Sequence, residues 1–247
     1  MEKIQIKIGD VKIGAGAPIS VQSMTNTQTD NVEATLRQIN ELHSCGCEIV
    51  RLAVLNKECA QKIKEIKKKS PIPIVADIHF DYRLALECMN SGVDALRLNP
   101  GNIGKAEHVK KVVNMAKKTQ TPIRIGVNAG SLEKELQADK SLSLEDKMVK
   151  SALSHIKILE DCDFNLIKVS LKSSNVMTTI KAYKKIYVSS TYADQWLANK
   201  KAELTAQGQS EEDAAKTAKK ELLQQYAIQP VVAYGMFAGY DYAPLDN

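Results

Sequence analysis

Runs of apolar, β-branched residues alternate with amphipathic helical stretches along most of the chain, and this alternation constrains the fold more than any other feature. Strands that alternate with helices pair in parallel, so the pattern predicts an α/β fold. The six strands that we expect are Pro18–Met24, Glu48–Val54, Pro73–His79, Ala95–Asn99, Pro122–Asn128 and Leu166–Leu171.

The chain length favours a closed barrel over a doubly wound sheet. A (β/α)8 barrel takes about 250 residues, and the chain has 247. The Gly-x-Gly-x-x-Gly turn that typically follows the first strand of a doubly wound sheet is missing, since Gly14-Ala15-Gly16 precedes that strand. We therefore predict a TIM-like (β/α)8 barrel in which six βα units are clear and the last quarter is atypical.

Polar and glycine residues mark the helix ends. Asp30 with Glu33 and Ser143 with Asp146 have the spacing of capping boxes. Gly46 and Gly92 stand where a helix is expected to end, before the second and fourth strands. These signals support the same alternation.

The composition changes after Ile186, which divides the chain into a barrel portion, residues 1–186, and a helical and aromatic tail, residues 187–247. The tail contains a helical stretch from about Ala193 to Tyr226, interrupted near Gly208. We assign a seventh strand to Ile186–Ser189 and an eighth to Val231–Phe237. The tail either completes the barrel or is appended to it.

Composition excludes several classes of function. A net charge of +5, mostly from lysines, does not indicate nucleic-acid binding. No apolar run approaches the roughly 20 residues of a membrane helix, and the start of the chain has no signal-peptide core. Five cysteines form no disulfide framework, and no His–Cys–Asp grouping has zinc spacing. We expect a cytoplasmic protein with no metal site of its own.

Three of the five arginines lie inside strand-like runs, and the residues around them are the candidate site. Residues two apart on a strand share a face, and the carboxyl ends of barrel strands build the active site. The polar residues expected to converge there are Arg51, Asp77, His79, Arg97, Asn99, Arg124, Asn128, Lys168 and Ser170.

Positive charge exceeds negative charge in this set, which predicts an anionic ligand. Asp77 alone does not neutralise Arg51, Arg97, Arg124 and Lys168, and arginine's planar fork suits phosphate oxygens. A small substrate with several phosphate charges fits this pattern. The alternative is that each arginine pairs with a nearby acid at a strand end, for instance Arg51 with Glu48.

Two further features remain open between a functional and a structural interpretation. The loop from Asn99 to Gly104 either presents backbone N–H groups to an anion or is only a turn. His79 is either an acid–base group or a histidine at a strand end.

Five long motifs together carry a family resemblance. They are ISVQSMTNT at residues 19–27, IVRLAV at 49–54, VADIHFDYR at 75–83, LRLNPGNIG at 96–104 and IRIGVNAGSLE at 123–133, and IKVSLKSS at 167–174 extends them. With these motifs the chain resembles the 4-hydroxy-3-methylbut-2-enyl diphosphate synthase family of the methylerythritol phosphate pathway, over about residues 2–186. Residues 187–247 do not match.

The resemblance implies a TIM-like barrel that binds 2-C-methyl-D-erythritol 2,4-cyclodiphosphate and an oxidoreductase reaction, the two-electron reductive opening of its ring. Electrons come from flavodoxin or ferredoxin through a [4Fe-4S] cluster, and the family works as a homodimer. By resemblance Asp77 is the candidate catalytic residue. The substrate-binding positions are Arg51, Arg97, Asn99, Arg124, Asn128, Lys168 and Ser170.

The sequence departs from the family at the cluster. The family holds it in a C-terminal domain with a Cys-x-x-Cys pair and a third cysteine, whereas this chain has no such pair and no cysteine after Cys162. Cys45-x-Cys47 is expected at the end of the barrel away from the mouth. The family's seventh-strand segment with its glutamate is also missing. We expect this chain to bind substrate but to be inactive alone.

Two alternatives are kept. One is a pterin diphosphate-binding barrel similar to dihydropteroate synthase, which also has an arginine-, lysine- and asparagine-lined mouth. The other is a non-catalytic binding protein derived from the synthase barrel.

Overall fold

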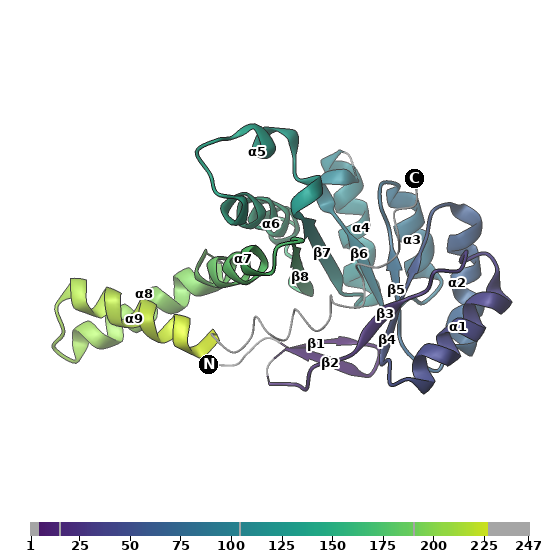
Figure 1. Cartoon of the computed structure of the whole chain (residues 1–247), viewed down its shortest axis with the longest axis horizontal. Helices are drawn as coiled ribbons and strands as arrows, with labels where there is room; N and C mark the ends of the chain where they lie inside the picture. The colour runs from purple at the N-terminus through teal and green to yellow at the C-terminus, as the bar shows by residue number, and fades with distance from the viewer. Residues whose placement is uncertain (1–4, 15, 104, 190, 227–247) are drawn as a thin grey trace. The chain divides into compact units, whose positions relative to one another are not determined.

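A computed structural model describes residues 5–14, 16–103, 105–189 and 191–226 (Figure 1). The described residues form two compact units, which are described separately: one contains residues up to 126 together with 155–170, and the other contains 127–154 together with 171–226. Among the described residues, no helix has the length and apolar character needed to cross a bilayer.

The helices and strands alternate as the sequence predicts. The strands are β1 (Gln5–Ile8), β2 (Val11–Gly14), β3 (Gln22–Met24), β4 (Ile49–Ala53), β5 (Ile74–Asp77), β6 (Ala95–Leu98), β7 (Ile123–Asn128) and β8 (Ile167–Lys172). The helices are α1 (Val32–Ser44), α2 (Lys57–Lys69), α3 (Tyr82–Asn90), α4 (Ala106–Thr119), α5 (Lys134–Ala138), α6 (Leu144–Glu160), α7 (Val176–Ser189), α8 (Thr191–Ala206) and α9 (Glu211–Tyr226). Two 3-10 turns, η1 (Pro100–Asn102) and η2 (Ala129–Ser131), follow β6 and β7.

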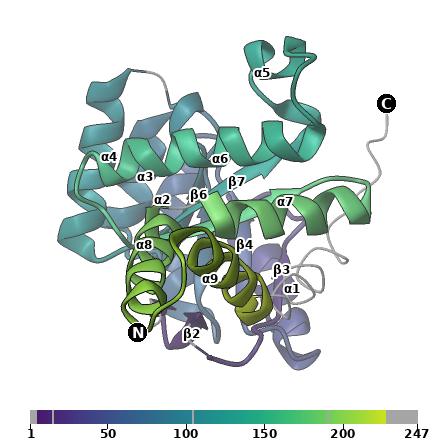
Figure 2. The ribbon, with the colours of Figure 1, turned by 90° about the vertical axis from the view of Figure 1, so that its left-hand side faces the viewer.

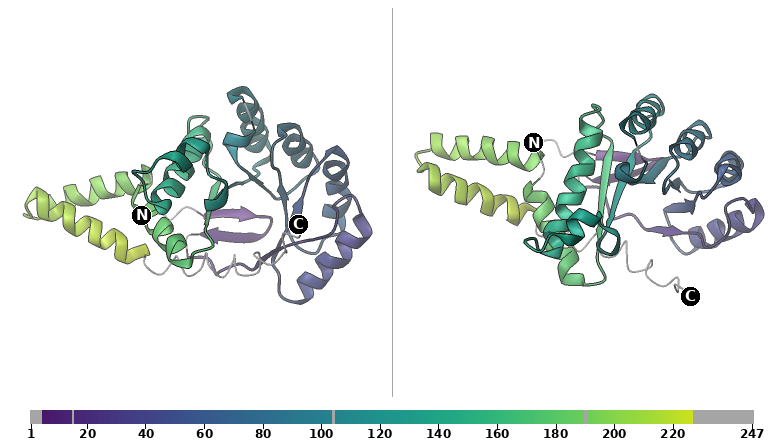
Figure 3. Two further views of the ribbon diagram at one scale, coloured as in Figure 1. Left: turned by 45° about the horizontal axis from the view of Figure 1, so that its top comes forward. Right: turned by 90° about the horizontal axis from the view of Figure 1, so that it is seen from above.

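A six-stranded sheet runs in chain order from β3 to β8, and the pairs from β3 to β7 are parallel. The helices α1 to α4 follow one another along the outer side of the curled sheet (Figures 1 and 3). All six predicted strands are confirmed. The six strands with their helices are a partial (β/α)8 barrel, as predicted.

The antiparallel hairpin of β1 and β2, which we did not predict, packs against the amino-terminal parts of β4, β5 and β6. Ile8 packs in one buried cluster with Ile49, Val75 and Ala95, the first inward-facing residues of three neighbouring strands. The left panel of Figure 3 shows the hairpin lying on the concave side of the sheet. The cluster forms an apolar floor, and the side chains two residues further along each strand stand above it.

The helix-end predictions are mostly confirmed. Gly46 and Gly92 lie two residues after the last residues of α1 and α3 and have positive φ angles of 89° and 82°, a conformation that favours glycine. Ser143 Oγ accepts a hydrogen bond from the backbone N–H of Asp146, as a capping residue does. The Asp30 prediction is wrong by one residue, because Asn31 caps α1 by accepting from the Ala34 N–H.

Within the second unit, the predicted seventh strand at Ile186–Ser189 is wrong, since these residues end helix α7. Thr179, Ala182, Tyr183 and Ile186 are buried, and their spacing of three and four is helical rather than alternating. The tyrosine hydroxyl accepts a hydrogen bond from the Leu171 N–H at 3.0 Å, which holds the helix to the end of β8. The predicted eighth strand, Val231–Phe237, lies outside the described residues.

The predicted helical stretch of the tail consists of two antiparallel helices. α8 and α9 lie side by side, and Figure 2 looks nearly along their axes. Gly208 has a φ angle of 94° in the turn between them, which confirms the predicted interruption. Leu204, Ala214 and Ala218 form their small buried core.

Candidate functional site

Asp77, the last residue of β5, is the acidic centre of the candidate site and is 3% exposed. Its Oδ1 atom accepts a hydrogen bond from Arg97 Nη1 at 3.0 Å. Arg51 Nε lies 3.4 Å from Oδ2, and His79 Nε2 lies 3.6 Å from Oδ1. The strand register causes this grouping, because Asp77 is paired with Ala53 on one side and Arg97 on the other.

The surroundings of Asp77 keep its carboxylate charged. Burial acts to raise its pKa, but the hydrogen bond with His79 and the charges of Arg51 and Arg97 act in the opposite direction and outweigh it. The pKa of Asp77 is therefore lower than its ordinary value. Two guanidinium groups share this one carboxylate, so the group as a whole keeps a positive charge.

Arg124, Ser170 and Lys168 form a second cationic group on β7 and β8. Arg124 Nε donates to Ser170 Oγ at 3.0 Å, and Ser170 Oγ lies 3.4 Å from the carbonyl oxygen of Ile125. Lys168 Nζ is buried, and it has no hydrogen-bond partner within the described residues. Burial and the charge of Arg124 lower the pKa of Lys168 to about 7. An ammonium group in such a place gains most from an anion that supplies the missing partner.

The two predicted asparagines each cap the turn that follows their strand. Asn99 Oδ1 accepts from the Gly101 N–H at 3.0 Å, and Asn128 Oδ1 accepts from the Gly130 N–H at 3.1 Å. Asn128 is exposed and belongs to the second unit. The structure thus joins Arg51, Asp77, His79 and Arg97 in one group and Arg124, Lys168 and Ser170 in another.

The alternative pairing of Arg51 with Glu48 is wrong. The Glu48 carboxylate accepts from the Val21 N–H at 2.8 Å, at the amino end of the strand. Arg51 instead extends to Asp77, and its Nη2 donates to Met24 Sδ at 3.1 Å. Sequence reasoning missed Met24, although the register that pairs it with Arg51 follows from placing β3 beside β4.

His155 on α6 is buried beneath the turn after β6. A Cβ atom on Gly101 would overlap the His155 ring at Cε1. Glycine at 101 therefore allows α6 to support the turn that carries Asn99. The helical spacing of the sequence places His155 on a helix, but it does not indicate which loop the helix faces.

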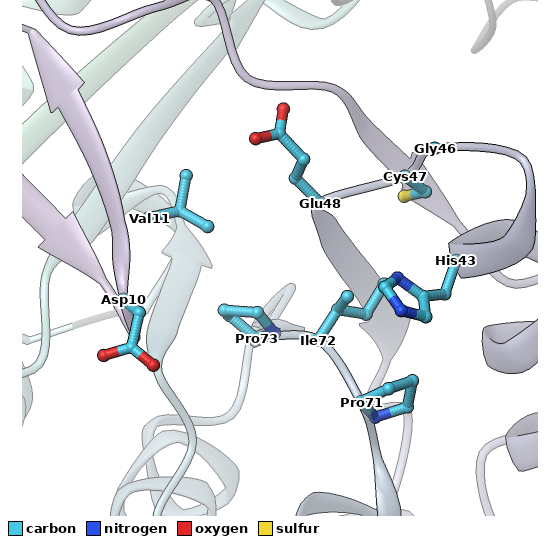
Figure 4. Close-up of a pocket in the computed structure, with 9 residues that line it drawn as sticks. All are labelled: Asp10, Val11, His43, Gly46, Cys47, Glu48, Pro71, Ile72 and Pro73. Carbon is cyan, nitrogen blue, oxygen red and sulfur yellow. The ribbon is translucent and has the colours of Figure 1, made fainter.

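Figure 4 shows a separate hollow of about 340 Å³ at the amino ends of β4 and β5. Asp10, His43, Cys47 and Glu48 are among its lining residues. Cys47 Sγ lies 3.1 Å from the Ile49 carbonyl oxygen, and burial raises the pKa of its thiol. Burial thus favours the protonated thiol over the thiolate that binds metals.

The five cysteines do not fit an iron–sulfur cluster. Cys45 is exposed, Cys162 is half-buried, and Cys47, Cys59 and Cys88 are buried. In the described part of the chain, no three His, Cys, Asp or Glu side chains are grouped as a metal-binding set.

Comparison with known families settles the ancestry of this barrel. The profile of the GcpE TIM-barrel domain matches residues 3–195. The chain belongs to the GcpE family. This GcpE barrel is 60% identical over 185 residues to the 4-hydroxy-3-methylbut-2-en-1-yl diphosphate synthase (flavodoxin) of Dehalococcoides mccartyi, which covers 75% of the chain and 53% of the relative.

Two other curated relatives have the same name. The synthase of Ruminiclostridium cellulolyticum is 56% identical over 180 residues, covering 73% of the chain and 51% of the relative. The synthase of Lawsonia intracellularis is 55% identical over 188 residues, which covers 76% of the chain and 52% of the relative. The GcpE barrel described here spans about half the length of the curated relatives that it matches.

Solved structures share the fold of this GcpE barrel at low sequence identity. Dihydropteroate synthase from Vibrio fischeri aligns with a TM-score of 0.53 and 11% identity, covering 74% of each chain. The 3-dehydroquinate dehydratase of Geobacillus kaustophilus aligns with a TM-score of 0.52 and 14% identity, again covering 74% of each. At these identities the likeness concerns the fold alone.

Proposed function

We propose that this chain binds 2-C-methyl-D-erythritol 2,4-cyclodiphosphate at the carboxyl ends of its sheet strands. The bound compound would be the substrate for reductive ring opening to 4-hydroxy-3-methylbut-2-enyl diphosphate in isoprenoid biosynthesis. The observation that carries the proposal is an excess of partly or fully buried positive charge. Arg51 and Arg97 share the single carboxylate of Asp77. Arg124 donates to the uncharged hydroxyl of Ser170, and the buried Nζ atom of Lys168 has no hydrogen-bond partner within the described residues. The family membership and the names of the relatives support the same ligand.

The two cationic groups suggest a division of labour between the two phosphates. We assign one phosphate to Arg124 and Lys168, with Ser170 holding the guanidinium of Arg124 in place. We assign the other to Arg51 and Arg97, which Asp77 orients through the contacts described above. Arginine's fork suits this role because it binds two phosphate oxygens at once.

The remaining candidate residues have supporting roles in the proposal. Asn99 and Asn128 shape the turns after β6 and β7. Asp77 is the candidate catalytic residue because it is the carboxylate kept charged between the two arginines. Its negative charge also limits how closely a phosphate approaches, which leaves the ring of the substrate as its nearest neighbour.

We assign the redox part of the reaction to a domain other than this barrel. Reductive ring opening consumes two electrons, and the relatives' name includes flavodoxin as the donor. Because the cysteines of this chain do not fit a cluster, we propose that a separate domain, in a homodimer or from another chain, brings the [4Fe-4S] group to the barrel. Residues 1–186 are the proposed substrate-binding portion, and the chain alone is expected to bind without turnover.

Anaerobic calorimetric titration with the cyclodiphosphate tests the proposal. We expect binding by the unchanged chain and loss of binding in the double variant Arg51→Ala, Arg124→Ala. Arg37→Ala is the matched control, since Arg37 lies on α1 in an exposed ion pair with Glu33. No binding by the unchanged chain would refute the proposal. Displacement by a pterin diphosphate would favour the dihydropteroate-synthase-like alternative.

A further inference from the structure

Gly126 on β7 lies directly against the guanidinium group of Arg97. A Cβ atom built on Gly126 would stand 2.9 Å from Arg97 Nε, 3.1 Å from Nη2 and 3.4 Å from Cζ. These are the three nearest atoms, and all belong to one guanidinium group. The φ angle of Gly126 is not in the positive region, so the backbone conformation does not require glycine there. The position requires space, and Arg97 occupies that space.

The strand register explains how Arg97 reaches this position. Arg97 on β6 is paired with Arg124 on β7, and Gly126 is two residues further along on the same face. The Nη1 atom of the same guanidinium donates to Asp77 Oδ1, on the opposite neighbouring strand. Arg97 thus lies between β5 and β7, with one nitrogen on the carboxylate and the rest of its fork over the glycine.

We propose that Gly126 is a positioning residue for Arg97. Its missing side chain lets the guanidinium stay in hydrogen-bond contact with Asp77 while it lies low over β7, beside Arg124. The inference rests on the proposed function for the identity of the anion. The position of Arg97 itself does not depend on that function.

An alanine at 126 tests this role because it should move the arginine and leave the fold intact. At 2.9 Å something must shift, and the nearest atoms are the far end of a long, flexible side chain rather than backbone. The guanidinium would turn away from β7, and its charge-assisted hydrogen bond with Asp77 would lengthen or break.

Side-chain NMR of the full chain reports the arginine position directly. The chain has five arginines, so its Nε–H spectrum contains few signals, and Arg97→Lys assigns the signal of Arg97. We expect Gly126→Ala to shift the Arg97 signal and to speed its exchange with water. Gly130→Ala is the control, because a Cβ there meets nothing closer than Asn128 Oδ1 at 3.8 Å. An unchanged Arg97 signal in Gly126→Ala would overturn the inference.

Titration with the cyclodiphosphate then shows whether Gly126 acts through Arg97. Loss of a well-aligned charge-assisted bond predicts roughly ten- to hundredfold weaker binding in Gly126→Ala. In an Arg97→Ala background the same change should have no further effect, whereas an equal loss in both backgrounds would overturn the route through Arg97. If the unchanged chain does not bind the cyclodiphosphate, the proposed function fails, and the NMR result still decides the role of Gly126.

Discussion

Lys168 should couple anion binding to pH. Burial and the charge of Arg124 lower its pKa from 10.5 to about 7, and its Nζ atom has no hydrogen-bond partner in the described part of the chain. A phosphate placed against this nitrogen favours the charged form and raises the pKa again. Above pH 7, binding must therefore include the uptake of a proton by Lys168, and affinity should fall.

The size of the effect follows from the pKa. With a pKa of about 7, roughly nine-tenths of Lys168 is protonated at pH 6 and roughly one-tenth at pH 8, so binding should be about tenfold weaker at pH 8. Stability should change in the opposite direction. The unfolded chain holds this proton up to a higher pH than the folded chain, so the free energy of unfolding rises by about 1 kcal/mol between pH 6 and pH 8.

Calorimetric titration with the cyclodiphosphate at both pH values measures the first quantity, and urea unfolding without ligand measures the second. Each phosphorus of the ligand carries one strongly acidic hydroxyl, so the ligand does not titrate in this range. Buffers of different ionisation enthalpy count the proton that is taken up. We expect Lys168→Met to remove the pH dependence, whereas the exposed control Lys157→Met keeps it. Equal affinity of the unchanged chain at both pH values would refute this reasoning, as would a tenfold change that persists in Lys168→Met.

Three further predictions concern stability, each measured by urea unfolding. Ile8→Ala removes the centre of the apolar floor and should cost about 2–4 kcal/mol, more than Ile13→Ala at its half-buried edge; equal losses would contradict the packing of the floor. Asp77→Asn leaves two guanidinium groups without their carboxylate and should cost about 3 kcal/mol, whereas Asp161→Asn in an exposed pair should cost under about 0.5 kcal/mol. Folding lowers the pKa of Asp77. The stability that its carboxylate contributes is therefore fully present above its ordinary pKa and is lost as the pH falls through the pKa of the folded state. The difference in free energy of unfolding between Asp77→Asn and Asp161→Asn should accordingly shrink in acid. Gly101→Ala overlaps His155 and should cost about 1–3 kcal/mol, and His155→Ala in the same chain should restore part of it; no recovery would place the cost elsewhere.

The strands and the positions of the arginines were predictable because they follow from local periodicity. Apolar alternation located all six sheet strands, and the rule that residues two apart share a face placed Arg51 above Ile49 and Arg97 above Ala95. The hairpin of β1 and β2 was missed although its signal was present. Gly9-Asp10 separates two short runs of alternating apolar residues, which is a typical hairpin pattern.

The partners of each charge were less predictable, because they depend on how neighbouring strands are shifted against one another. Arg51 is three residues from Glu48 in sequence but reaches Asp77, since the register of β4 and β5 brings that carboxylate to its Nε. The space over Gly126 depends in the same way on the pairing of β6 with β7. The strand predicted at Ile186–Ser189 was wrong for a different reason. A short apolar segment fits a strand and a helix equally well until its burial is known.

The apolar floor under the arginines determines how the site should respond to ionic strength. Ile8, Ile49, Val75 and Ala95 are each at most 3% exposed. The guanidinium groups of Arg51 and Arg97, which lie one layer above them, therefore have a region of low dielectric constant on that side. Dissolved ions weaken interactions between solvent-exposed charges far more than between charges that lie partly outside the solvent. Anion binding at Arg51 and Arg97 should therefore depend less on added salt than binding to the lysine-covered helices, which separates the two kinds of contact in one titration series.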